Sequence, residues 1–177
     1  MRRESLHTRD DYTPEQLEIR RLADINNAYG ELFADLITVL YYKDPAIILR
    51  TIPNPLTPGT HQYEIYDTNR WTRSLCNTRN RLETFDFSQT YDIEGGWGVD
   101  NHKSTAPARY ALCEKFFLHQ DFSGAVAVQA QSAIDESIFQ LSREPHLKEV
   151  NLDGEEVPSA EKSLRIINEL FIKNLGG

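Results

Sequence analysis

A regular stripe of apolar residues near the start of the chain is the feature that most constrains the fold. Its members follow Thr13-Pro14-Glu15-Gln16 and are Leu22, Ile25, Tyr29, Leu32, Phe33, Leu36 and Leu40. Steps of three and four residues place these side chains on one face of a helix. Thr13 and Gln16 form a capping box, and Pro14 suits the first helical turn. We therefore predict a long helix over 13–42 that ends before Asp44-Pro45, because the residue before proline avoids helical geometry.

The last third of the chain repeats this helical periodicity. It predicts a helix over 105–119, with Thr105 as a capping residue, and a second helix over 125–142. The turn between them is short, which favours antiparallel neighbours. An acidic connector over 146–157, with a tight turn at Asp153-Gly154, leads to a closing helix that starts near Pro158.

The middle of the chain, residues 44–104, has a different character. Pro53, Pro55, Pro58 and Gly59 interrupt it. Alternating β-forming residues predict short strands over 62–66, 85–87 and 91–93, and the arginine-rich stretch over 69–82 is expected to be helical.

Together these segments predict a mainly α fold. It is a helical bundle made of the long N-terminal helix, the C-terminal helical hairpin and the final helix, with an irregular middle insert carrying a few short β-strands. The polar residues 1–12 are expected to form an N-terminal arm, and residues 13–177 a single domain with 44–104 as the insert.

Composition limits the function classes. The 177 residues are 40% hydrophobic, as in globular proteins, and the net charge of −8 opposes contact with a nucleic-acid backbone. The longest apolar stretch, over 36–42, is too short to cross a bilayer, and no apolar run follows the first residues. We therefore expect a cytoplasmic protein, or one incorporated in a particle assembled in the cytoplasm, with no membrane contact.

The two cysteines, Cys76 and Cys113, are far apart in the sequence and are not in a CxxC pair. We interpret them as buried free thiols. The five histidines show no metal-ligand spacing, and no nucleophile or phosphate-loop motif occurs. The sequence therefore predicts no catalytic residue, no metal and no cofactor.

Two oppositely charged patches and one aromatic loop are the candidate partner-binding residues. The set is Arg70, Trp71, Arg73, Arg79, Arg81, Trp97, Glu149, Asp153, Glu155 and Glu156. Arginine beside an aromatic residue can dock on an acidic partner, and an exposed tryptophan is a frequent interface anchor. The alternative is that the arginines pair within their own chain and that the acidic residues form a solvated face. If both patches are used, one copy's arginines can meet another copy's acids, and such head-to-tail contacts build rings or filaments.

These features favour a non-enzymatic assembly or adaptor protein that binds copies of itself or another assembly component. The layout resembles that of the small connector proteins of tailed-virus particles, which implies a structural role in virion assembly. One alternative is a small acidic inhibitor or immunity-type protein that blocks a basic partner. A second alternative is an enzyme whose site lies in the 60–104 segment, built from Tyr63, Tyr66, Arg70, Asp100 and His102.

Overall fold

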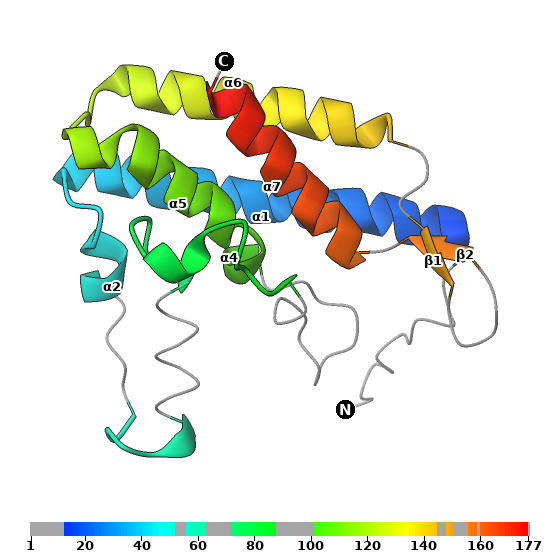
Figure 1. Ribbon diagram of the computed structural model, residues 1–177, viewed down its shortest axis with the longest axis horizontal. Coiled ribbons are helices and arrows are strands. Elements are labelled where there is room, and N and C mark those ends of the chain that lie inside the picture. The colour runs from blue at the N-terminus through cyan, green and yellow to red at the C-terminus, as the bar shows by residue number, and fades with distance from the viewer. Residues whose placement is uncertain are drawn as a thin grey trace, which may run out of the picture.

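The computed structural model describes residues 13–51, 56–62, 72–87, 101–144, 148–150, 156–158 and 160–176. The predicted arm over 1–12, the predicted strand over 91–93 and all but the first residue of the predicted strand over 62–66 lie outside these residues, and that first residue, Gln62, is helical rather than extended. The described part is mainly helical, as predicted (Figure 1).

Helix α1, Pro14–Tyr42, is the longest element and has the predicted ends. The Thr13 hydroxyl accepts from the Gln16 amide, and the Gln16 side chain accepts from the Thr13 amide, so the capping box is formed. Lys43 stops the helix in the left-handed conformation, just before Asp44-Pro45. A short helix α2, Ile47–Thr51, follows.

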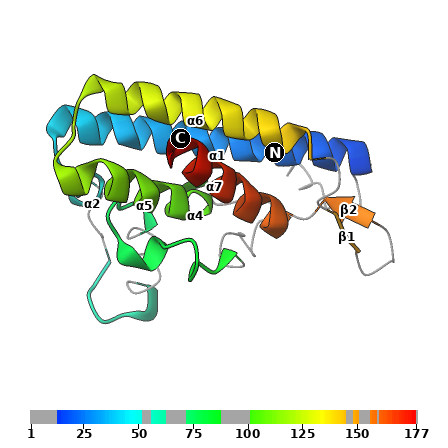
Figure 2. The ribbon, with the colours of Figure 1, turned by 45° about the horizontal axis from the view of Figure 1, so that its top comes forward.

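The C-terminal helices also match the predicted order. They are α5, Ala106–Lys115, with the 3-10 turn η4, Phe117–His119; α6, Gly124–Ser142; and α7, Ala160–Gly176. A further short helix, α4, Asn101–Ser104, lies in the part that was expected to be irregular. Helix α6 runs antiparallel beside α1, and α7 crosses both obliquely (Figures 1 and 2). The core lies where these helices meet, and it includes Leu32 and Leu36 of α1, Ile134 of α6, and Ile167 and Phe171 of α7.

The predicted helix over 69–82 is wrong in its described part. Thr72 is helical, but residues 73–77 form a non-helical turn, and the short 3-10 helix η2, Thr78–Asn80, follows. The Asn77 side chain accepts from the Arg79 backbone amide, and the Asn80 side-chain amide donates to the carbonyls of Thr72 and Ser74. These bonds compete with the helical ladder and hold the chain in a compact turn.

Strands occur in a different place from the one predicted. Within the described part of the 44–104 insert there is no strand, and Phe85 and Phe87 instead pack edge to face, 5.0 Å between ring centroids. The only strands among the described residues are β1, Lys148–Val150, and β2, Glu156–Pro158, which pair antiparallel with Glu149 opposite Val157. They flank the segment in which a tight turn was expected at Asp153-Gly154, and that turn itself lies outside the described residues.

Cys76 and Cys113 form a disulfide, so the prediction of free thiols is wrong. Their Cα atoms lie 5.2 Å apart although 37 positions separate them in sequence. The turn that carries Cys76 packs against α5, which carries Cys113, and this places the two residues within bonding geometry.

Thr105 occupies the N-cap position of α5, as predicted, but its side chain does not make the capping bond. The Asn168 side chain of α7 supplies it across the core by accepting from the Ala108 amide at 3.0 Å. The nitrogen of the Asn168 side chain donates to the carbonyls of Ser104 and Leu164, so this one buried side chain connects α4, α5 and α7.

Candidate interaction surface

The predicted arginine patch is divided between separate internal contacts. Arg70 and Trp71 lie outside the described residues. Arg73 donates to Asp35 of α1 at 2.8 Å, and Arg81 donates to the Tyr110 hydroxyl at 3.2 and 3.3 Å. Arg79 is exposed. Arg73 therefore pairs within its own chain, and its partner Asp35 lies 38 positions away in the sequence.

The predicted acidic patch and the aromatic loop are only partly described. Glu149 belongs to β1 and Glu156 to β2, whereas Trp97, Asp153 and Glu155 lie outside the described residues. Their role as partner-binding residues stays a prediction.

A buried ion cluster on α1 holds the α5 region in place. One carboxylate oxygen of Asp35 accepts from Arg73, and the other accepts from Arg109 at 2.6 Å. Arg109 is fully buried, and this burial lowers the pKa of its guanidinium, an effect that the Asp35 charge opposes. Because buried charges must be paired, the cluster fixes the position of α5 relative to α1.

A small polar hollow of about 320 Å³ lies beside this region. Arg81, Glu83, Tyr110 and Glu114 contribute its polar groups, and the Arg81 guanidinium sits 5.5 Å from the centre of the Tyr110 ring. Arg81 already has the Tyr110 hydroxyl as an internal partner in this hollow.

The outer side of α6 presents apolar side chains to solvent. Val128 is 71% exposed and Phe139 is 51% exposed. The exposed residues that follow one line along the helix are Ala125, Val128, Ser132, Asp135, Phe139 and Ser142. We call this line the α6 seam. Asp135 is its single charged member, and Glu136 beside it is the only other charge on the helix.

The outer side of α1 continues the same surface. Its residues are Ile19, Ala23, Asn26, Gly30, Phe33 and Ile37, none of them charged, and we call them the α1 seam. Ile19 is 63% exposed and Ile37 is 44% exposed, whereas Phe33 is half-buried. A Cβ added to Gly30 would have no neighbour within 4 Å, so the surface is open there.

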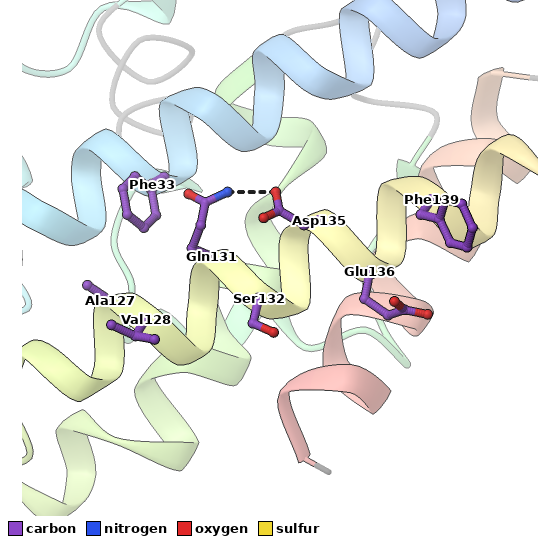
Figure 3. A pocket seen from close by; sticks show the side chains of 8 residues that line it. All are labelled: Phe33, Ala127, Val128, Gln131, Ser132, Asp135, Glu136 and Phe139. Atoms are coloured by element: carbon purple, nitrogen blue, oxygen red, sulfur yellow. Dashed lines mark hydrogen bonds between the residues drawn. The ribbon is translucent and has the colours of Figure 1, made fainter.

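An open groove of about 670 Å³ lies between the two seams. Figure 3 shows Phe33 of α1 beside Gln131 of α6, with Phe139 at the far end of the row. Gln131 donates to Asp135 at 2.8 Å, and this bond orients the carboxylate at the rim. Ala127 and Val128 add apolar lining to that of the two phenylalanines. We refer to the two seams and this groove together as the α1–α6 face.

The outer side of α7 differs sharply from this face. Its exposed residues include Glu161, Lys162, Arg165, Glu169 and Lys173, so charges of both signs cover it. Exposed apolar side chains are unremarkable singly, but a contiguous set of them on a charge-poor surface marks an interaction site. Sequence reasoning missed the α6 seam because it ranked charged and aromatic clusters and used the apolar periodicity only for the core.

The described residues contain no cluster of three potential metal ligands, and none of the described helices is long and apolar enough to cross a membrane. Comparison with known proteins found no matching family model, no matching curated protein and no matching solved structure.

Proposed function

We propose that this chain is a non-enzymatic assembly or adaptor protein that binds protein through the α1–α6 face. The observation that supports this function is the pair of exposed seams, which places Val128, Phe139, Ile19 and Ile37 in solvent. The charges on this surface are the acidic pair on α6 and Arg143, whose guanidinium lies 4.3 Å from the centre of the Phe139 ring. Apolar surface on a rigid helical scaffold gains free energy when a partner removes it from water. A role as a connector-type structural component of a larger particle, as in virion assembly, is the form of this function that the sequence favours.

The two alternatives stay predictions. The inhibitor hypothesis depends on the acidic connector, and the enzyme hypothesis depends on Tyr63, Tyr66, Arg70, Asp100 and His102, of which only His102 is among the described residues. As to location, disulfides form and persist in oxidising surroundings, so the Cys76–Cys113 bond favours such a setting over the cytoplasm that the sequence predicts.

Site-specific photocrosslinking tests the proposed surface. A photoreactive phenylalanine analogue replaces Val128 in the full chain, and the matched control carries it at Glu169, an exposed residue of α7. We expect discrete protein adducts from position 128, in an extract of the source organism, that are absent from position 169. The same adduct should form from position 33, which lines the same groove. Equal labelling from 128 and 169, or none from 128, would contradict the proposal.

A further inference from the structure

We infer that the partner of the α1–α6 face is a second copy of this chain, packed with α6 antiparallel to α6 of the first copy. This inference rests on the proposed function and specifies its partner. It is carried by the spacing, side-chain sizes and charge of the two seams.

The α6 seam has the spacing of a helix-pairing surface. Its members at 125, 128, 132, 135, 139 and 142 are separated by three, four, three, four and three residues, and all six are exposed. Alternating steps of three and four residues keep one line of side chains facing a neighbouring helix. The inner side of α6 is already packed against α1 and α7, so this second line is free for another helix.

Antiparallel pairing makes the seam complementary to itself. A two-fold axis between Ser132 and Asp135 brings Val128 against Phe139 of the second copy and Ala125 against Ser142 of the second copy. Each Asp135 then meets the Ser132 hydroxyl of the other copy, which can donate to the carboxylate. Parallel pairing would set the two Asp135 carboxylates at the same level, whereas this antiparallel register offsets them by three residues, about 4.5 Å along the helix axis.

The α1 seam is symmetric about the same level. Phe33 lies beside Ala127 and Gln131, about five residues before the point at which the axis crosses α6. Because α1 and α6 are antiparallel, the same axis crosses α1 about five residues before Phe33, close to Ala28. An axis there places Ala23 against Phe33 of the second copy, a small residue against a large one. Asn26 meets Gly30, where the open surface permits close approach. Both seams therefore satisfy one two-fold operator, as an isologous interface requires.

The available area reaches the minimum for a specific pair. Helix α6 has 19 residues and is about 28 Å long, and two helices side by side are about 20 Å wide. Each copy would cover about 560 Å², or about 1,100 Å² in total, which is just above the roughly 1,000 Å² minimum for a specific interface. Because the chain carries a net charge of −8, self-association is least opposed on a face with few charges.

The first test is the mass of the purified full chain in solution, by light scattering after size exclusion, at low and high salt. We expect twice the mass of one chain at both salt concentrations, since apolar contacts are not screened. Val128→Glu and Phe139→Glu should each raise the dissociation constant about tenfold or more, because a buried unpaired carboxylate is costly. The matched control is Leu118→Glu, a residue 65% exposed outside both seams, and it should leave the dimer intact.

Cysteine crosslinking tests the antiparallel register. Ala125→Cys and Ser142→Cys are prepared separately, then mixed and mildly oxidised, while the native cysteines stay in their disulfide. We expect a crosslinked dimer in the mixture and none in either single preparation, since identical positions lie about 25 Å apart along antiparallel helices. Crosslinks in a single preparation would overturn the antiparallel register.

Other outcomes separate this inference from the proposed function. A monomer at all concentrations, or a dimer that dissociates in high salt, would overturn self-association through the seams. If position 128 nevertheless forms a photoadduct of a different mass with another protein, the α1–α6 face would remain a protein-binding surface with a different partner.

Discussion

The two sides of α1 differ in which side chains they expose and which they bury. On its outer side, Ile19 and Ile37 stand in solvent with no charged neighbour on the seam. On the side toward α5, Asp35 is buried and accepts hydrogen bonds from two arginines. One helix thus exposes apolar groups and buries charged ones.

The contrast separates the determinants of folding from those of binding. A buried, paired charge costs stability when its partner is lost, so the Asp35 side defines how the helices are placed. An exposed apolar residue contributes little to the isolated chain, so the outer side is open to a partner. Substitutions on the two sides should therefore affect different measurements.

Asp35→Ala should give the largest effect. It leaves the Arg109 guanidinium buried without its carboxylate, and we expect the free energy of unfolding to fall by about 3–5 kcal/mol. Chemical denaturation measures the loss. The control is Glu136→Ala, an exposed acid on the α1–α6 face, which should change stability by less than about 0.5 kcal/mol. Equal losses for the two variants would remove the distinction between the two sides.

Substitutions of the buried Leu141 and the exposed Phe139 of α6 should differ in their effect on stability, which sharpens the contrast between buried and outer side chains. Leu141 is fully buried, and Leu141→Ala should cost roughly 3 kcal/mol at protein concentrations where the chain is monomeric. Phe139→Ala should then cost less than about 0.5 kcal/mol, although a larger side chain is removed. At high protein concentration, Phe139→Ala should lower the melting temperature further, because linkage to the dimer is lost. A cost for Phe139→Ala that does not depend on concentration would argue for a purely structural role.

Tyr29→Phe should give a smaller effect than Asp35→Ala or Leu141→Ala, with the opposite sign. The Tyr29 hydroxyl is buried and has no hydrogen-bond partner among the described residues, and burial raises the pKa of this group well above its usual value. Removing the hydroxyl should raise the free energy of unfolding by about 1 kcal/mol at neutral pH.

The pH dependence of stability, compared between the parent chain and Tyr29→Phe, gives a second check. Above pH 10, about the usual pKa of tyrosine, the unfolded chain loses this proton while the folded chain keeps it. Stability of the parent chain should therefore fall with rising pH relative to Tyr29→Phe. A constant difference between the two proteins from pH 7 to pH 11 would show that Tyr29 is not held neutral by burial.

Local signals in the sequence predict the helices but not the contacts between them. The capping box at Thr13, the stop before Asp44-Pro45 and the apolar stripe of α1 are patterns within a few residues, and the structure confirms them. Turn chemistry in 72–80 was harder to predict, because arginine-rich composition suits a helix while the Asn77 and Asn80 side chains favour a turn.

The remaining features depend on pairs of residues that are distant in sequence. Asp35 meets Arg109 across 74 positions, and Asn168 caps α5 across 60. No periodicity encodes such pairs, so neither the ion cluster nor the disulfide could be derived from one sequence. The α6 seam is different, since its three-and-four spacing is visible in the sequence and only its exposure required the structure.

The Cys76–Cys113 bond turns the intervening part of the chain into a covalent ring. A single cut of the backbone between these residues opens the ring without dividing the molecule. The piece that carries α1 would stay joined to the piece that carries α5, α6 and α7, and they would migrate as one molecule until a reductant is added. Every helix of the α1–α6 face would therefore keep its partners after such a cut.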